Sequence, residues 1–168
     1  ISIGPHGVFT ADQAREVARE HLRSMRQGID PRTVAKERAA ETVSLRDVAD
    51  AYKRDRPLKD SSKAEIERHV TTTFEAWLKK PMASITREAV TKRFNEIKNH
   101  GLRGDGPAPA QANQGFSVLR ALFNYAIREY RRPDGTAIIK DNPVEVLHKK
   151  WAPFKAKTTR IPDSKVGA

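Results

Sequence analysis

Residues 109–130 form the sequence PAQANQGFSVLRALFNYAIREY, and no other segment constrains the architecture as strongly. Its apolar residues recur every three or four positions, which is the spacing of one side of an α-helix. They are Phe116, Leu119, Leu122, Phe123, Ala126, Ile127 and Tyr130. The opposite face and its edges carry amide, hydroxyl and guanidinium groups, at Gln111, Asn113, Gln114, Ser117, Arg120, Asn124 and Arg128. We therefore expect a long helix with one buried side and one polar side, and the polar side suits the acceptor-rich edge of a nucleic acid.

Capping residues and apolar spacing predict further helices on both sides of this segment. Ser44 and Asp47 can cap a helix that ends before Pro57. A second helix is expected to start at Ser61 or Ser62, with Glu65 completing a capping box, and to continue to Lys80. Its buried side would be Ile66, Val70, Phe74 and Trp77. A third begins at Thr86, and the loop GLRGDGPAP over 101–109 ends it.

A short fifth helix is expected over 142–150, because Asn142 can cap it and Pro143 fits its first turn. Residues 131–140 are expected to form a polar turn in which Ala137, Ile138 and Ile139 either tuck under the bundle or make a short strand-like piece. No strand pattern of convincing length occurs between 44 and 150. The predicted fold is all-α, with four main helices and a short fifth.

A separate N-terminal helix is predicted from Thr10 to Gln27. Thr10 and Gln13 form a possible capping box, and Gly28 supplies the stop. Its apolar stripe is Ala14, Val17, Ala18, Leu22 and Met25. Residues 1–9 resemble the frayed end of a β-structure, and residues 31–43 are expected to be a linker. Because the chain begins at Ile1, we expect a fragment of a longer protein.

The formal net charge is +11, and it is unevenly distributed. Residues 1–43 hold 7 basic and 6 acidic residues, whereas residues 44–168 hold 25 and 15. From Lys149 onward, six basic residues accompany the single Asp163. Such an excess attracts polyanions, of which nucleic acid is the commonest, although a generally soluble lysine-rich surface would give the same count.

Several classes of protein are excluded or disfavoured by what the sequence lacks. There is no cysteine, so disulfides, thiolate chemistry and cysteine-based metal sites are excluded. No apolar run approaches the ~20 residues of a membrane span, and no signal peptide is visible. These features fit a cytoplasmic protein without contact with a membrane.

One catalytic pattern stands out, and we interpret it as structural. His100 and Arg103 have a His-x-x-Arg spacing, and Tyr130 follows at a suitable distance. However, His100 leads into a Gly/Pro loop, and Tyr130 belongs to the apolar stripe. The other histidines, His6, His21, His69 and His148, have no metal-binding spacing and are expected in surface or cap roles. We expect no catalytic residue, no metal and no cofactor, and the aromatic residues should pack in the core.

The order of these motifs resembles a known family. Ala112-Asn113, then Leu119, Leu122-Phe123 and Ala126, and finally Asn142-Pro143 resemble the core-binding domain of phage-type tyrosine recombinases, the site-specific integrases. Gln114 stands where members often have Arg. Residues 10–15, TADQAR, with Gly28-Ile29-Asp30-Pro31 resemble the end of the arm-binding domain of such integrases.

The resemblance implies a domain plan. Residues 1–30 would be the C-terminal remnant of an arm-binding domain, 31–43 a linker, 44–150 the core-binding domain, with a SAM-like bundle, and 151–168 a basic linker toward a catalytic domain that is absent here. The parent would be a DNA-breaking and rejoining enzyme with a tyrosine nucleophile, whereas this fragment would not be an enzyme. Its partners would be duplex DNA, its own catalytic domain and other recombinase protomers on DNA, and we expect the fragment alone to be mostly monomeric.

The resemblance also implies that the second and fourth helices clamp duplex DNA across the major groove, in DNA integration and site-specific recombination. The candidate DNA-binding residues are Lys59, Ser62, Lys63, Gln111, Asn113, Gln114, Ser117, Arg120, Lys155 and Lys157. The alternative is a helical protein-interaction adaptor with a basic surface, in which residues 10–27 form the docking helix.

Overall fold

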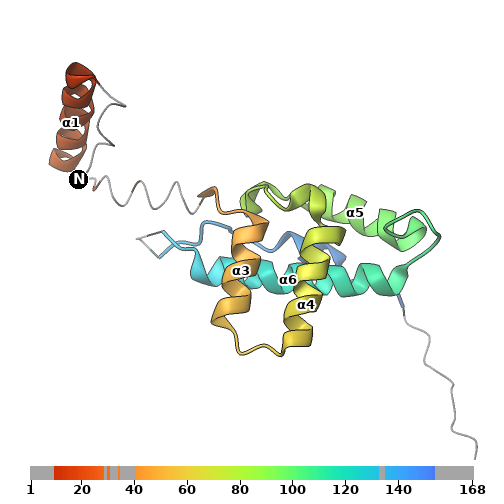
Figure 1. Ribbon diagram of the computed structural model, residues 1–168. Helices are drawn as coiled ribbons and strands as arrows, with labels where there is room; N and C mark the ends of the chain where they lie inside the picture. The colour runs from red at the N-terminus through yellow and green to blue at the C-terminus, as the bar shows by residue number, and fades with distance from the viewer. Residues whose placement is uncertain (1–9, 29, 31–33, 35–40, 133–134, 154–168) are drawn as a thin grey trace, which may run out of the picture. The chain divides into compact units, whose positions relative to one another are not determined.

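The computed structural model describes residues 10–28, 30, 34, 41–132 and 135–153. In this part the protein is 67% helix, with five α-helices and no strand (Figure 1). The all-α prediction is therefore confirmed. The α-helices are α1 (Ala11–Arg26), α3 (Leu45–Asp55), α4 (Asp60–Arg68), α5 (Arg87–His100) and α6 (Pro109–Glu129). A π-helical turn, η1 (His69–Thr73), and three 3₁₀ turns, η2 (Glu75–Trp77), η3 (Met82–Ser84) and η4 (Pro143–Leu147), complete the elements.

The chain groups into two compact units. Unit 1 comprises Ile1–Ile85 and Leu122–Asn142, and unit 2 comprises Thr86–Ala121 and Pro143–Ala168. Helix α6 therefore contributes its first part to unit 2 and its last part to unit 1. The domain boundaries that the sequence suggested stay predictions.

Helix α1 has the predicted ends. The Gln13 amide donates to Thr10 Oγ1 at 3.3 Å, and the Thr10 amide donates to Gln13 Oε1 at 2.9 Å, which completes the capping box. Gly28 follows with φ +78, a backbone conformation that favours glycine. The described side chains leave the apolar stripe uncovered, since Leu22 is 57% and Met25 47% exposed.

In unit 1, helix α3 begins at the predicted cap. The Ser44 hydroxyl accepts from the Asp47 amide, and Asp47 accepts in return from the Ser44 amide. Leu45, Val48 and Ala49 are fully buried. The helix ends with the cap residue Arg56, as the following Pro57 requires.

The second predicted helix differs from the structure at both ends. Helix α4 begins at Asp60, before Ser61 and Ser62, and its cap residue Lys59 makes no side-chain capping bond, so the predicted capping box is wrong. The helix also stops at Arg68 instead of continuing to Lys80, because η1 and η2 follow. The Thr71 and Thr72 hydroxyls donate to the carbonyls of Glu67 and Arg68 at 2.8 and 2.6 Å, a pattern that bends helices.

The apolar residues predicted for this helix are nevertheless in the core. Ile66, Val70, Phe74 and Trp77 are all buried, and the Phe74 and Trp77 rings stack with centroids 5.5 Å apart. The expectation of a surface or cap role for His69 is wrong, since His69 is fully buried and its Nδ1 lies 2.9 Å from Thr73 Oγ1. A histidine one helical turn before a threonine hydroxyl can be buried because its ring nitrogen has a partner.

The second part of α6 completes the core of unit 1. Leu122, Phe123 and Ala126 are buried as predicted. Tyr125, which the apolar stripe did not include, is only 3% exposed. Both expectations for residues 131–140 are confirmed, since Arg131 and Ala137 form an isolated antiparallel bridge while Ile138 and Ile139 are buried.

In unit 2, the Thr86 hydroxyl caps α5, and Val90, Phe94 and Ile97 are buried. The first part of α6 buries Ala112, Phe116 and Leu119. The loop between the two helices starts at Gly101, which has φ +73 and lies so close to the Gly106 carbonyl that a Cβ would be 2.8 Å from its oxygen. Only glycine fits there. The short fifth helix is a 3₁₀ turn, η4, which packs on α5.

Candidate nucleic-acid interface

The first part of α6 carries an exposed polar edge, formed by Gln114 and Ser117, with Gln111 half-exposed beside it. The position of this edge follows from helical geometry, because Ala112, Phe116 and Leu119 occupy the opposite, buried side. The sequence therefore predicted the outward direction of these three polar residues correctly.

Asn113 differs from the expectation. It is only 6% exposed, and its side-chain amide is hydrogen-bonded to the backbone of Ala152. Nδ2 donates to the Ala152 carbonyl at 2.9 Å, and Oδ1 accepts from the Ala152 amide at 3.1 Å. A side chain with both functions engaged inside the unit is not on the exposed polar edge, and we omit Asn113 from the candidate interface.

Arg120 lies at the border of the edge. Its Nε donates to Glu145 Oε1 at 2.9 Å, and the two side chains are 48% and 45% exposed. This partner could not be predicted, since Glu145 is 25 residues away and no local spacing relates the two. The pair leaves about half of the guanidinium side chain accessible to solvent.

The candidate residues near α4 belong to unit 1. Lys59 is exposed and immediately precedes the helix, whereas Ser62 and Lys63 are half-buried in its first turn. The Ser62 and Lys63 amides both donate to the Lys59 carbonyl at 3.0 Å. The remaining candidates, Lys155 and Lys157, lie outside the described residues.

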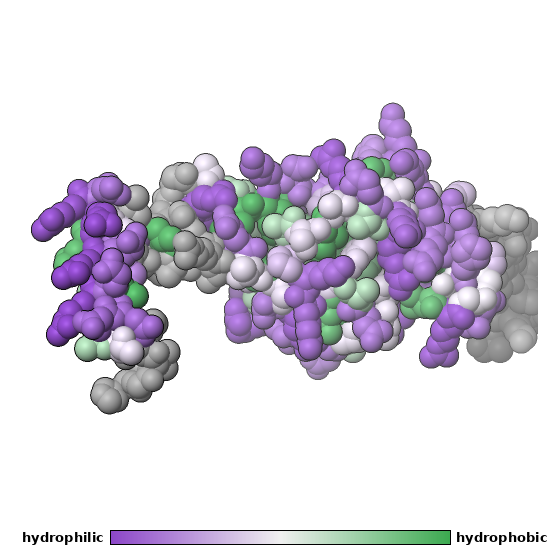
Figure 2. All heavy atoms as spheres, turned by 90° about the horizontal axis from the view of Figure 1, so that it is seen from above, coloured by the Kyte–Doolittle hydropathy of each residue, from purple (hydrophilic) through white to green (hydrophobic). Residues whose placement is uncertain are grey.

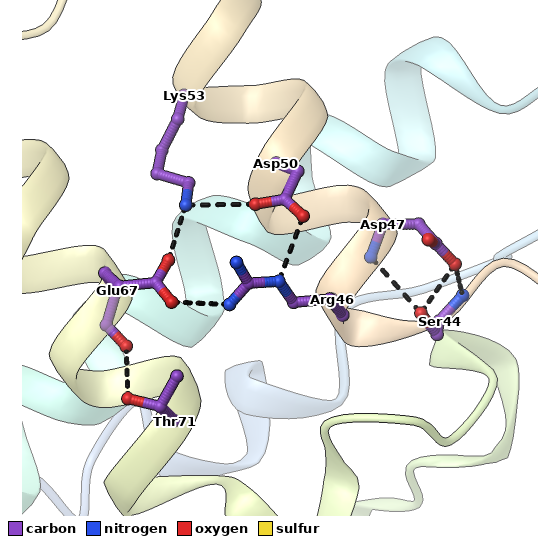
Figure 3. Close-up of polar contacts among 7 residues, drawn as sticks. All are labelled: Ser44, Arg46, Asp47, Asp50, Lys53, Glu67 and Thr71. Carbon is purple, nitrogen blue, oxygen red and sulfur yellow. Dashed lines mark hydrogen bonds and ion pairs between the residues drawn. The ribbon is translucent and has the colours of Figure 1, made fainter.

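The basic residues of α3 are occupied by acids. Figure 3 shows Arg46 and Lys53 reaching across to Glu67 of α4, both at 2.5 Å, while Asp50 bonds each of them at 3.0 Å. The hydrogen bonds from Arg46 and Lys53 hold the pKa of Glu67 below its ordinary value. This cluster joins α3 to α4, so its two cations serve packing within unit 1.

The face seen in Figure 2 is mostly hydrophilic, with smaller hydrophobic areas between the polar side chains. Among the described residues, no helix is long and apolar enough to cross a membrane. The same part of the chain contains no group of three or more histidine, aspartate and glutamate side chains that could hold a metal ion.

The residues of the catalytic pattern have ordinary positions in the fold. His100 is the last residue of α5, and Tyr130 directly follows α6, where partial burial raises the pKa of its hydroxyl. A raised pKa disfavours the phenolate, the form in which a tyrosine is the stronger nucleophile.

Comparisons with protein-family models, with curated proteins and with solved structures find no match to this chain.

Proposed function

We propose that this chain binds duplex DNA, as the core-binding module of a phage-type integrase in site-specific recombination. The observation that carries the proposal is the exposed edge of Gln114 and Ser117 on α6, in a chain with a net charge of +11. The order of motifs from Ala112-Asn113 to Asn142-Pro143 supports the integrase class. The chemistry of strand cleavage would belong to the parent enzyme.

The groups on this edge suit the task. A glutamine amide offers a donor and an acceptor, which match the N6 and N7 atoms of adenine, whereas serine hydroxyls bond to bases or phosphates. The half-exposed guanidinium of Arg120 can approach a phosphate or guanine from the border of the same edge. In unit 1, Lys59, Ser62 and Lys63 offer phosphate contacts.

The first prediction concerns salt. If about six phosphates are neutralised, a plot of log affinity against log salt concentration should have a slope of roughly −5. Fluorescence anisotropy of a labelled duplex, titrated with the chain at two or more salt concentrations, measures this slope. Absence of binding even at low salt would reject the proposal.

A paired variant tests the edge itself. Gln114→Ala with Ser117→Ala should weaken binding several-fold while the thermal midpoint stays nearly unchanged, because both side chains are exposed. The matched control is Asn95→Ala, which removes an exposed amide from α5 in the same unit. Equal affinities for the edge variant and the control would contradict the assignment of this edge.

A second candidate function is a protein-interaction adaptor, and one observation favours it. Leu22 and Met25 of α1 are 57% and 47% exposed, so this helix presents apolar side chains. Competition separates the two functions. For a DNA-binding module, unlabelled duplex should displace the labelled duplex at far lower charge concentration than polyglutamate does, whereas equal displacement would indicate charge attraction alone.

A further inference from the structure

The last described part of unit 2, residues 143–152, runs along α6 and is here called the C-terminal strap. At one end Glu145 pairs with Arg120, and at the other end Ala152 pairs with Asn113. Asn113 and Arg120 are seven residues apart, so they share one face of α6, about 10 Å apart along its axis. The strap therefore runs antiparallel to the first part of α6.

The pair of Asn113 and Ala152 is specific to an amide side chain. It uses one donor and one acceptor on the same planar group, which asparagine has and aspartate or leucine lacks. Both residues are buried, at 6% and 4% exposed, so losing the side chain would leave the amide and carbonyl of Ala152 unpaired away from water. This pair holds the backbone at one defined point.

A second anchor lies beside it. The Trp151 ring meets Phe94 edge-on with centroids 5.9 Å apart, and Phe94 meets Phe116 in the same way at 5.4 Å. Trp151 and Ala152 are thus fixed to α5 and α6 by different interactions. The chain leaves unit 2 at the exposed Pro153, next to Ala152.

The sequence beyond this exit is basic. Lys155, Lys157, Arg160 and Lys165 follow, against the single Asp163. We propose that Asn113 is a positioning residue that fixes the exit of this basic segment beside the Gln114 and Ser117 edge, so that the segment's cations add to binding of the DNA phosphates. This inference rests on the proposed function.

The expected size follows from tether length. Lys155 is three residues beyond Ala152 but eight beyond Leu147, the last fully buried residue of η4. If the anchor moves back to Leu147, the effective concentration of that cation at a neighbouring phosphate falls as the −3/2 power of length, about fourfold. We expect Asn113→Ala to weaken DNA binding by about that factor.

The first test needs no DNA. Because the chain has no cysteine, Pro153→Cys places a single nitroxide label at the exit. Electron paramagnetic resonance should show a mobile label when Asn113→Ala is added and a restrained one otherwise. Trp151→Ala, which removes the other anchor, should also raise mobility and serves if Asn113→Ala reduces folding. An unchanged spectrum in both variants would overturn the inference.

The second test is a double-mutant cycle in the full chain. The partner variant replaces Lys155, Lys157, Arg160 and Lys165 by Gln. Asn113→Ala should cost about fourfold in affinity with the charged segment and nothing with the neutralised one. An equal loss in both backgrounds would overturn the inference, as would no loss in either. If the unmodified chain fails to bind DNA at low salt, the proposed function itself is rejected, and the inference with it.

Discussion

At the scale of single residues, Tyr125 and Asp55 make a contact that ties the end of α3 to α6 within unit 1. The Tyr125 hydroxyl donates a hydrogen bond to Asp55 Oδ2, and its ring meets Tyr52 edge-on at 5.3 Å. Burial, with the bond to Asp55, raises the pKa of Tyr125 to about 12. The same bond, with one from Arg54, holds the pKa of Asp55 below its ordinary value.

This pair predicts a pH dependence with a definite sign. The stability contributed by Asp55 is present above its ordinary pKa of 3.8 and is lost as pH falls below it. The stability contributed by Tyr125 is present below pH 10.0 and is lost as pH rises toward about 12. Tyr125→Phe should lower the thermal midpoint at pH 7 by a few degrees and flatten both flanks of the profile.

Thermal unfolding followed by circular dichroism from pH 3 to pH 11 measures these changes. The matched control is Tyr52→Phe, which keeps the aromatic contact and removes a different hydroxyl. If the two variants gave the same profile, the bond between Tyr125 and Asp55 would not be the origin of the pH dependence.

At the scale of elements, local patterns predicted helix starts well where the cap and the apolar stripe agree. The capping boxes at Thr10 and Ser44 and the cap at Thr86 all form. At α4 the stripe was right and the helix was wrong, because an apolar spacing indicates which residues are buried and not which carbonyl each amide reaches. The same residues stay buried across the π-helical turn at His69–Thr73.

Contacts between distant residues were beyond prediction. On α6, Asn113 and Gln114 are neighbouring amides in one polar pattern, yet one is buried against Ala152 and the other is exposed. What separates them is a segment 39 residues away, and a single sequence does not show where that segment lies. The candidate site was therefore predictable as a helix face but not residue by residue.

The ion cluster between α3 and α4 gives a prediction at this scale. Glu67 bonds Arg46 and Lys53 at once, and all three side chains are 18% to 37% exposed, so solvent screens them in part. Glu67→Gln should cost about 1 kcal/mol at pH 7. Since the pKa of Glu67 is lowered, the difference between variant and parent should vanish as pH falls below the ordinary value of 4.5.

Urea unfolding at pH 7 and pH 3, in low and high salt, measures this contribution. The control is Glu75→Gln, which makes the same change of charge at an exposed position in η2. A loss as large for the control as for Glu67→Gln would mean that net charge, and not the cluster, matters.

At the scale of the whole molecule, the positive surplus is shaped by which acids are paired. The cations of α3 are held by Asp50 and Glu67, and Arg120 of α6 is held by Glu145. The first pairing lies between packed helices, whereas the second lies at the border of the candidate DNA edge. A phosphate approaching that edge would compete with Glu145 for the same guanidinium.

Two opposite variants test this competition. Arg120→Ala should weaken DNA binding and make the salt slope shallower by about 1, while the thermal midpoint stays nearly unchanged because half-exposed ion pairs contribute ~0–1 kcal/mol. Glu145→Gln should strengthen binding about threefold, since it frees the guanidinium and removes a negative charge near the phosphates. Glu88→Gln, the same charge change on exposed α5, is the control, and anisotropy titrations with thermal melts measure all three. A large loss of stability in Arg120→Ala would show that the ion pair serves the fold of unit 2, and equal gains in the two glutamate variants would show that net charge alone sets the affinity.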